Sequence, residues 1–426
     1  MKVFLDTVGC RLNQSEIERM ARQFRTAGHT IVAEMSEAEL VVVNTCAVTM
    51  QAASDSRQKI RQVNRQSPEA QVVATGCWAT LEPEQAANLI GSPQVILNQD
   101  KDMLPFTVLG IDPDLLDMDA IERQILPGAR HRTRAFIKVQ DGCDAFCTFC
   151  VTRIARGRSR SMPLQKVLLD IQSALDGGAL EIVISGVQLG SWGKDLTGEL
   201  GLRDLAEAIL TGSDSRRLRF SSVEPWDLHE EFFELFADAR VCRHLHISLQ
   251  SGSANILKRM GRKITPQEFE LLAVYARKVD KDFSLTTDII AGFPGESEKE
   301  FLESLDYIKS IGFNGGHVFP YSPRPGTAAA TMSGLLPLKE RKARAVEVRR
   351  VIAETALRYH QKQIGKLGNI LWESSEKTTD GYLLQGLSEK FVRVSAFTPT
   401  ELWNVISNVQ FVEVEGDGIS GEIISD

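Results

Sequence analysis

The sequence predicts an α/β protein with an N-terminal parallel α/β domain, a (β/α)6 partial TIM barrel and a small antiparallel β-barrel at the C-terminus. Three observations lead to this prediction. Short apolar runs alternate with amphipathic stretches near the N-terminus, and the same rhythm returns on a larger scale from Ala135. After about Gly365, short apolar stretches are separated by polar turns. At 426 residues the chain is long enough for two or three domains.

These shifts in pattern predict four segments: residues 1–110, 111–134, 135–364 and 365–426. The segment 111–134 is expected to be a linker between the first two domains. It is acidic over Ile111–Ile125, and it is basic and contains proline and glycine over Pro127–Arg134.

Alternating strands and helices define the predicted N-terminal domain. Strands are expected at Lys2–Val8, Leu40–Asn44 and Gln71–Thr75. Helices are expected at Gln14–Ala27, Ala53–Arg65 and Pro83–Ile90. Such a pattern indicates a parallel sheet that is covered on both faces. Each strand is followed by a cysteine, at Cys10, Cys46 and Cys77, so these cysteines are expected at the carboxyl edge of the sheet, where α/β proteins build sites.

The second domain is expected to contain six βα units. Its predicted strands are Ala135–Gln140, Glu181–Ser185, Arg217–Ser221, His244–Leu249, Ser284–Ile290 and Gly316–Pro320. Its predicted helices are Leu164–Leu175, Leu202–Leu210, Glu230–Ala237, Pro266–Val279 and Glu298–Ser310, and a long helix is expected over Leu338–Gln363. Six units make a partial barrel that is open on one side, and barrels of this kind place their sites at the carboxyl ends of the strands. The apolar stretches of the tail are typical of a small antiparallel barrel.

The strongest chemical signal is the set of seven cysteines. Cys143, Cys147 and Cys150 have the spacing C-x3-C-x2-C, which is too tight for a disulfide framework and allows three thiolates to bind three irons of one cubane cluster. The alternative is a zinc or incomplete electron-transfer site, but zinc would need a fourth His or Cys. None lies between Phe136 and Arg160. Two groups of three cysteines therefore indicate two iron–sulfur clusters.

Cys242 and two histidines are predicted to be packing residues rather than metal ligands. Cys242 precedes a predicted strand and is expected to be a small buried apolar residue. His244 and His246 alternate on that strand, with no third metal ligand evident.

No apolar run could span a bilayer, and Asp6 interrupts the region where a signal peptide would be apolar. A cytoplasmic protein with no membrane partner is expected, in which cysteines indicate metal or redox chemistry.

The motifs resemble, over essentially the full length, those of the methylthiotransferases, a branch of the radical S-adenosylmethionine (AdoMet) superfamily. The likeness rests on Gly9–Gln14, Asn44–Cys46, Thr75–Cys77, Gln140–Cys150, Ala155–Gly157, Ser222–Pro225, His246–Gly252, Thr287–Glu296 and Phe319–Thr327. The resemblance implies that the C-terminal barrel is TRAM-like. It also implies an enzyme that uses AdoMet and two 4Fe–4S clusters, with a second AdoMet as methyl donor.

The first cysteine motif, Gly9-Cys-Arg-Leu-Asn, is most similar to the Gly-Cys-Lys-Val-Asn type. That type implies methylthiolation at C2 of N6-threonylcarbamoyladenosine beside the tRNA anticodon. Alternative substrates are isopentenyladenosine in tRNA and an aspartate of a ribosomal protein, and a more remote alternative is a non-catalytic iron–sulfur protein that binds RNA. The implied partners are the tRNA anticodon arm, a sulfur source and an electron donor such as a flavodoxin or ferredoxin.

The resemblance also implies roles for individual residues. Cys143, Cys147 and Cys150 would hold the AdoMet-binding cluster, and Cys10, Cys46 and Cys77 would hold an auxiliary cluster that handles sulfur. Arg156 is expected to act at the active site. The residues expected to bind AdoMet are Phe149, Ser185, Gly186, Glu224, Gln250, Asp288, Val318 and Phe319.

Charge along the chain bears on how RNA would bind. Residues 366–426 contain four basic and ten acidic residues, a net charge of −6, which is a poor match for phosphates. Basic residues concentrate instead in the segments 57–65, 130–134, 153–160 and 339–350. The segments 130–134, 153–160 and 339–350 are therefore predicted to supply most of the electrostatic affinity for tRNA.

Overall fold

The computed structural model describes residues 1–89, 93–112, 114 and 133–424. The chain forms two compact units. The first comprises residues 1–145, 150–178 and 185–187, and the second comprises 146–149, 179–184 and 188–426. Most of the expected linker, 111–134, lies outside the described residues, and the predicted domain boundaries stay predictions. Among the described helices, none combines the length and apolar character needed to cross a bilayer.

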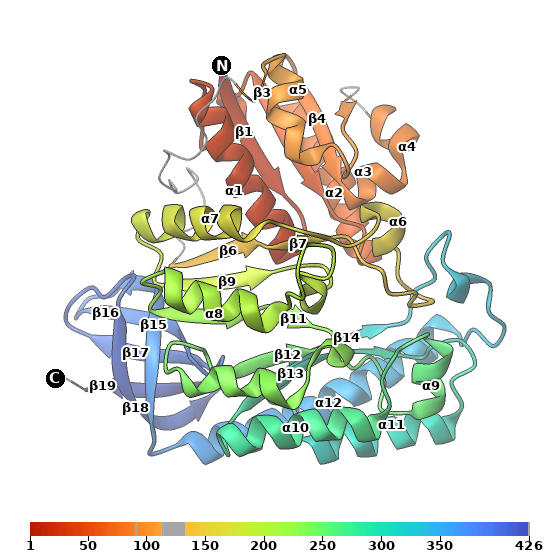
Figure 1. Cartoon of the computed structure of the whole chain (residues 1–426), viewed down its shortest axis with the longest axis vertical. Helices are drawn as coiled ribbons and strands as arrows, with labels where there is room; N and C mark the ends of the chain where they lie inside the picture. The colour runs from red at the N-terminus through yellow and green to blue at the C-terminus, as the bar shows by residue number, and fades with distance from the viewer. Residues whose placement is uncertain (90–92, 113, 115–132, 425–426) are drawn as a thin grey trace. The chain divides into compact units, whose positions relative to one another are not determined.

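A five-stranded parallel sheet forms the centre of the first unit (Figure 1). In spatial order its strands are β2 (Thr30–Ile31), β1 (Lys2–Thr7), β3 (Leu40–Thr45), β4 (Gln71–Gly76) and β5 (Gln94–Val95). All residues of β3 are buried. Val42 packs in one apolar cluster with Phe24, and the next residue, Val43, packs in another with Ile60. The predicted sheet with two covered faces is therefore confirmed.

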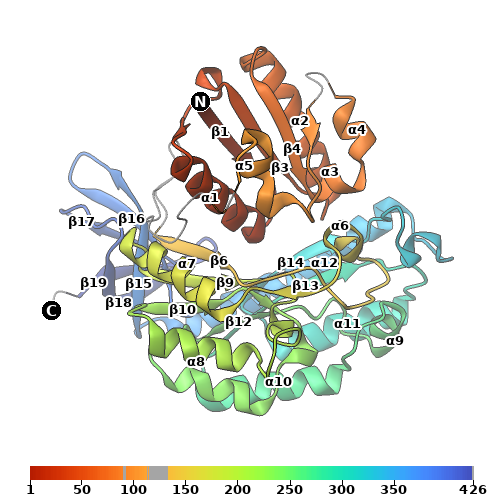
Figure 2. The ribbon, with the colours of Figure 1, turned by 45° about the horizontal axis from the view of Figure 1, so that its top comes forward.

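Helices cover both faces of this sheet. The helices of the first unit are α1 (Arg11–Thr26), α2 (Met50–Gln66), α3 (Cys77–Leu81), α4 (Pro83–Ala87), α5 (Leu104–Leu109), α6 (Thr152–Arg156) and α7 (Leu164–Asp176), with 3-10 turns η1 (Met35–Glu37) and η2 (Lys101–Met103). Helices α1 and α5 pack on one face, and α2, α3 and α4 pack on the other (Figure 2). The unit also contains β6 (Arg134–Lys138) and the antiparallel pair β7 (Gln140–Asp141) and β8 (Arg160–Ser161).

Parallel strands also organise the second unit. They are β9 (Glu181–Ser185), β10 (Arg217–Phe220), β11 (Ser222–Val223), β12 (His244–Ile247), β13 (Ser284–Ala291) and β14 (Gly315–Pro320). Strands β9 and β10 pair with each other, and the last four form a sheet in the order β11-β12-β13-β14. The helices are α8 (Leu202–Gly212), α9 (Ala254–Arg259), α10 (Pro266–Val279), α11 (Glu298–Ile311) and α12 (Leu338–Gln363), with 3-10 turns η4 (Leu189–Ser191), η5 (Pro225–Asp227) and η7 (Ala328–Thr331).

The predicted helix over Glu230–Ala237 forms, but as the 3-10 helix η6. A 3-10 helix brings residues three apart onto one line. Phe233 and Phe236 thereby both face Phe283, with ring centroids 6.5 and 4.9 Å from it. Packing of these aromatic rings accounts for the tighter helix.

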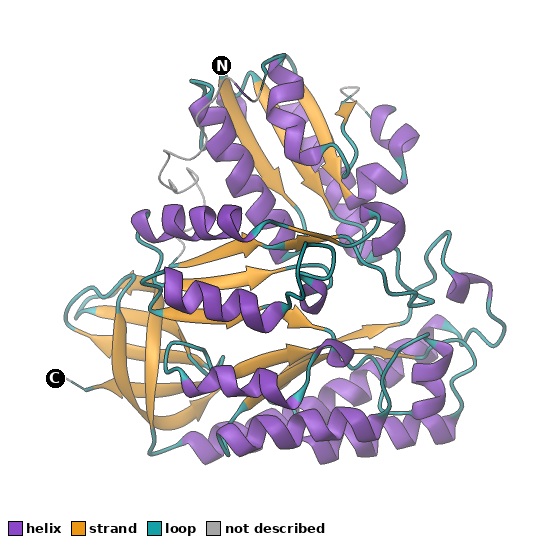
Figure 3. Ribbon diagram, viewed as in Figure 1, coloured by secondary structure: helices purple, strands orange, loops and turns teal. Residues whose placement is uncertain are grey.

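The C-terminal strands close into a barrel, as predicted (Figure 3). Its strands are β15 (Leu367–Lys377), β16 (Tyr382–Ser388), β17 (Arg393–Thr398), β18 (Ile406–Glu415) and β19 (Gly418–Ile423), in the order β15-β16-β17-β19-β18. Buried arginines of β10 fix this barrel to the parallel strands. Arg217 donates to Leu387 O at 3.1 Å and Arg219 to Ser388 O at 3.0 Å.

Two arginines of α12 are buried, contrary to their expected role as RNA contacts. Arg344 Nη1 lies 2.9 Å from Glu296 Oε2, and Arg341 donates to the backbone oxygens of Leu336 and Tyr321. Both side chains therefore hold α12 in place, which argues against phosphate contacts from these two residues of the predicted RNA-binding segment 339–350.

Candidate active site

Three cysteines stand at the carboxyl ends of adjacent strands in the first unit. Cys10 caps the N-terminus of α1 after β1, Cys46 directly follows β3, and Cys77 opens α3 after β4. Neighbouring strands β1, β3 and β4 pair in parallel, so the three positions share one edge of the sheet. Cys46 and Cys77 are buried, whereas Cys10 is exposed.

Two glycines let the cysteine loops approach one another. Gly9 has φ +103°, and a Cβ there would lie 2.5 Å from Cys46 Sγ. Gly76 has φ +94°, and a Cβ there would lie 2.3 Å from Thr45 O. Side chains at both positions would collide and would strain the backbone. The glycine before each of Cys10 and Cys77 is therefore part of what brings the thiols together.

Cys46 is held by a serine of α2. Its backbone N donates to Ser56 Oγ at 3.0 Å, and the same hydroxyl donates to Cys46 O at 3.2 Å. Burial raises the pKa of the Cys46 thiol to about 11, and negative charge on Cys10 and Cys77 acts in the same direction. Cys46 is thus a thiol at neutral pH, and any metal that it bound would have to displace this proton.

Arg156 lies buried beside Cys77. Its Nε donates to Cys77 Sγ at 3.3 Å, and its Nη1 donates to Glu16 Oε1 and to Asp141 Oδ1, each at 2.9 Å. Its Nη2 donates to Asn13 Oδ1 at 2.8 Å. Burial opposes the charged form, but the Cys77 sulfur and the two carboxylates raise the pKa of Arg156 well above its usual value.

Glu16 is the centre of this network of charges. Its carboxylate contacts Arg156, Lys101 Nζ at 2.7 Å and Lys138 Nζ at 3.5 Å. Its side chain is only 2% exposed. Burial would raise the pKa of Glu16, but these three cations hold it well below the usual range. Glu16 is therefore an anion throughout the neutral range.

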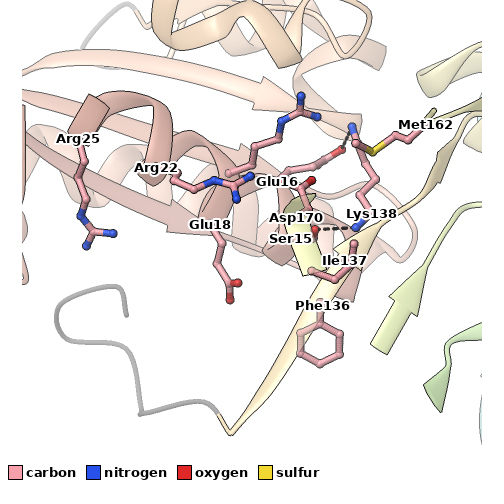
Figure 4. Close-up of a pocket in the computed structure, with 11 residues that line it drawn as sticks. Ser15, Glu16, Glu18, Arg22, Arg25, Phe136, Ile137, Lys138, Met162 and Asp170 are labelled. Carbon is pink, nitrogen blue, oxygen red and sulfur yellow. Dashed lines mark hydrogen bonds and ion pairs between the residues drawn. The ribbon is translucent and has the colours of Figure 1, made fainter. Parts of the chain in front are cut away.

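Glu16 and Lys138 also line a small pocket beside α1 (Figure 4). In this pocket the backbone N of Lys138 donates to Ser15 Oγ at 3.0 Å. Arg22 is paired with Asp170 of α7 and donates to Ser173 Oγ at 3.0 Å. The polar lining thus links α1 to β6 and α7.

The donor set at the sheet edge fits an iron–sulfur cluster. In the described part of the chain, no three His, Cys, Asp or Glu side chains come close enough to hold a single metal ion. A cubane instead spreads its thiolate ligands over different irons, so the sulfurs need not converge on one point. Three thiols on one sheet edge, with N–H donors of Arg156 and Asn98 directed at Cys77, match that requirement.

Each cysteine of the C-x3-C-x2-C loop has an N–H group near its sulfur. Ala145 N lies 3.3 Å from Cys143 Sγ, and Thr152 N lies 3.4 Å from Cys150 Sγ, both within the first unit. Cys147 belongs to the second unit, where Arg262 Nη1 lies 3.8 Å from its Sγ. Such donors favour thiolates and help to set the reduction potential of a bound cluster.

Arg262 is a second buried arginine that contacts a cysteine. It pairs with Glu224 Oε2 at 2.7 Å, and its guanidinium lies 4.4 Å from the centre of the Trp226 ring. Burial raises the pKa of Glu224, and Arg262 opposes that shift. Cys147 and Glu224 are therefore joined by one cation within the second unit.

Several residues expected to bind AdoMet lie on neighbouring strands of that unit. Gln250 adopts φ +77°, an uncommon conformation for a residue other than glycine. It is held there because its N donates to Asp288 O at 2.8 Å and its O accepts from Ile290 N at 2.9 Å. Asp288 Oδ2 lies 3.2 Å from His246 Nε2. Strained positions of this kind often mark functional sites.

The remaining expected residues are divided between the units. Val318 and Phe319 lie on β14, which pairs with β13, and Phe149 packs edge-on against Phe293 with centroids 6.5 Å apart. Ser185 and Gly186 belong to the first unit, where Ser185 is buried at the end of β9.

The network around Arg156 contains residues that sequence patterns did not single out. They are Asn13, Glu16, Lys101, Lys138 and Asp141. Separately, in the second unit, sequence patterns did not single out Arg262 beside Glu224. Asn13 and Asp141 belong to the motifs Gly9–Gln14 and Gln140–Cys150, and Glu16 follows Asn13 by three residues on α1, so these motifs were the available signal. Lys101, Lys138 and Arg262 had none.

Two family models match the chain. Residues 2–98 match the family described as "Uncharacterized protein family UPF0004", and residues 137–308 match the radical SAM superfamily. Among solved structures, the radical AdoMet methyltransferase TsrM from Kitasatospora setae has a TM-score of 0.59 at 17% identity, covering 77% of this chain and 75% of that one. This likeness concerns the fold alone.

Curated relatives match over nearly the whole chain. The threonylcarbamoyladenosine tRNA methylthiotransferase MtaB of Thermotoga maritima is 35% identical over 99% of this chain and 98% of its own length. The protein of the same name from Bacillus subtilis is 33% identical, covering 94% of this chain and 91% of its own length. A tRNA-2-methylthio-N(6)-dimethylallyladenosine synthase of Caldicellulosiruptor saccharolyticus is 29% identical, covering 98% and 91%.

The two matched regions together define a radical SAM enzyme with an additional N-terminal α/β domain. Similarity to the methylthiotransferases extends along nearly the full length of both chains. The chain belongs to the radical SAM methylthiotransferase family. The cofactors of this family are AdoMet and 4Fe–4S clusters, including one cluster beyond the AdoMet-binding one.

Proposed function

We propose that the protein inserts a methylthio group at C2 of N6-threonylcarbamoyladenosine, next to the anticodon of tRNA. The observation that carries this proposal is the 35% identity to a relative named for that substrate, with 98% of the relative covered. The relative named for dimethylallyladenosine is 29% identical. Because the substrate is a tRNA, we place the reaction in the cytoplasm, with a flavodoxin- or ferredoxin-like electron donor and a separate sulfur source.

In this proposal Cys143, Cys147 and Cys150 hold the cluster that binds AdoMet. Bound there, the cluster and AdoMet supply a 5′-deoxyadenosyl radical, which can remove a hydrogen that no side-chain base could remove at neutral pH. The N–H groups of Ala145, Thr152 and Arg262 support the three thiolates.

For the AdoMet site itself, we infer polar contacts from Ser185, Gly186, Glu224, Gln250 and Asp288. The half-buried Glu224, with its raised pKa and its cationic neighbour Arg262, suits a contact with the charged amino acid end of AdoMet. Val318, Phe319 and Phe149 carry no charge and would supply aliphatic and aromatic contacts.

Cys10, Cys46 and Cys77 hold the auxiliary cluster in this proposal. Three observations support this assignment: the cysteines share one edge of the sheet, two glycines let their loops approach one another, and N–H donors lie near Cys77. Cys10 is the exposed member of this group, and the other two cysteines are buried. A second AdoMet would act as the methyl donor.

Product analysis tests the substrate assignment. The anaerobically reconstituted protein is incubated with AdoMet, a reductant and one of three substrates: tRNA that carries threonylcarbamoyladenosine, tRNA that carries isopentenyladenosine, or ribosomal protein. Mass spectrometry is expected to detect methylthio product only with the first. Product solely from one of the other two would contradict the substrate but leave the family intact.

Single alanine variants of Cys10, Cys46 or Cys77 are expected to lose methylthio product while reductive cleavage of AdoMet persists. The physical reason is that the radical needs only the cluster held by the other three cysteines. Product and 5′-deoxyadenosine are quantified in the same reaction by liquid chromatography and mass spectrometry. Full product from any of these variants would show that the auxiliary-cluster assignment is wrong.

Exposed lysines of α12 are better candidates for tRNA contact than its buried arginines. Replacing Lys339 and Lys342, both exposed, with Ala is expected to weaken tRNA binding and to reduce the log–log salt slope by roughly one for each lost phosphate contact. A matched control is Arg350→Ala, because Arg350 already pairs with Glu347 at 3.0 Å. Fluorescence anisotropy at several salt concentrations measures the slope, and an unchanged slope in the lysine variant would count against this contact.

A further inference from the structure

The buried charges around Arg156 are unequal in sign. Three buried cations, Arg156, Lys101 and Lys138, have side chains 2%, 2% and 7% exposed. Two buried anions face them in the described part of the chain: Glu16 at 2% and Asp141 at 10%.

Asp102 also contacts Lys138, at 3.1 Å, but its side chain is 55% exposed and is shared with Arg19. Water therefore screens that contact. Among the described residues, three buried cations therefore face two buried carboxylates and the partly exposed Asp102. Removing one partner of a buried ion pair is strongly destabilising, so these contacts hold Arg156 in one position.

Each donor group of Arg156 has a defined partner. Both terminal nitrogens of Arg156 are occupied, since Nη1 donates to Glu16 and Asp141 and Nη2 donates to Asn13. The third donor, Nε, points at Cys77 Sγ at 3.3 Å. The Cys77 sulfur is therefore the acceptor for the one donor of Arg156 that no carboxylate or amide oxygen occupies.

A second contact fixes the same sulfur to helix α6. Asn98 Nδ2 donates to Ala155 O at 2.8 Å and lies 3.7 Å from Cys77 Sγ. Ala155 directly precedes Arg156, and α6 begins two residues after Cys150, the last cysteine of the C-x3-C-x2-C loop. The helix next to one group of cysteines therefore holds a cysteine of the other group.

We propose that Arg156 is a positioning residue for the auxiliary cluster: it holds the Cys77 thiolate through Nε, and its charge stabilises the one-electron-reduced state of the cluster. One-electron reduction by a low-potential donor adds one negative charge to a cluster and requires no proton. A buried guanidinium beside a ligand sulfur favours that added charge and raises the reduction potential. The inference rests on the proposed function in one respect, the assignment of Cys77 as a ligand.

Potentiometric titration tests this role without measuring activity. Arg156→Gln and Arg156→Lys are compared with the wild type as anaerobically reconstituted holoenzymes, titrated with dithionite and followed by EPR. The titration is repeated in a background where Cys143, Cys147 and Cys150 are Ala, which isolates the auxiliary signal. The matched control is Arg153→Gln on the same helix, which removes the same charge from a guanidinium that donates to Asp144 O at 3.4 Å.

In Arg156→Gln, we expect the ratio of reduced to oxidised auxiliary cluster at a fixed potential to fall at least tenfold, which is roughly 59 mV for one electron. Arg156→Lys keeps the charge but not the fork of donors, so its shift should be smaller. Arg153→Gln should not change the ratio. Selective loss of the auxiliary irons from either Arg156 variant would also support the positioning role.

Two outcomes would overturn the inference: an unchanged auxiliary potential with full iron in the Arg156 variants, or an equal shift of both clusters. If Arg156→Gln does not fold, Arg156→Lys decides by the same criteria. A wild-type protein that binds only about four irons would instead refute the auxiliary cluster, and with it that part of the proposed function.

Discussion

Replacing Cys143, Cys147 and Cys150 together with Ala is expected to abolish reductive cleavage of AdoMet and to lower bound iron from about eight to about four per chain. The spacing of these cysteines suits one cubane, and the N–H groups near their sulfurs come from residues close to the loop and from Arg262. The other three cysteines depend on different strands, so their cluster should persist. Iron analysis and quantification of 5′-deoxyadenosine measure the two effects.

Cys242→Ala is the control for this experiment. Cys242 is 1% exposed, and its sulfur lies 3.9 Å from Glu181 in the second unit. Burial raises the pKa of this thiol to about 12, and Cys242 belongs to neither group of three cysteines. The variant should retain about eight irons and full cleavage. Loss of both cluster signals in the triple variant, with the fold intact, would show that the two sites are not independent.

Long periodic segments were predictable from the sequence because their signal is local. The strand Glu181–Ser185 and the helices Pro266–Val279 and Leu338–Gln363 have the predicted bounds. The carboxyl-edge positions of Cys10, Cys46 and Cys77 followed from the alternation of strands and helices alone. Helices α3 and α6 were missed because five residues are too few to show a 3.6-residue period.

The charge network could not be predicted because its partners are far apart in the chain. Arg156 meets Glu16 across 140 residues, and Lys101 meets Glu16 across 85. A basic residue in the sequence does not reveal whether its partner is a carboxylate or a phosphate. Arg344 illustrates this, since it looked like an RNA contact and is instead paired with Glu296.

Glu16→Gln is expected to lower the free energy of unfolding of the first unit by about 3–5 kcal/mol. This is the usual cost of removing one partner from a buried ion pair. The substitution leaves Arg156, Lys101 and Lys138 with Asp141 as their remaining buried carboxylate among the described residues. Hydrogen exchange of the β3 amides, which lie in a fully buried strand, measures this free energy in the full chain. Glu37→Gln is the control, because Glu37 is 53% exposed and lies 3.7 Å from Lys2, and a surface pair is worth about 0–1 kcal/mol.

The same variant should change how stability depends on pH. The pKa of Glu16 is well below its usual value in the folded chain, and an unfolded Glu titrates at about 4.3. The unfolded state therefore takes up this proton first as pH falls, so the contribution of Glu16 is fully present above that pH and is lost as pH falls toward the lower folded value. The wild type should lose this contribution below about pH 4.3. Because the Gln side chain of Glu16→Gln cannot titrate, the stability of the wild type should approach that of the variant in this acidic range. If the difference in stability between the two proteins stays constant from neutral pH into this acidic range, Glu16 is not the ionised partner of the three cations that its contacts indicate.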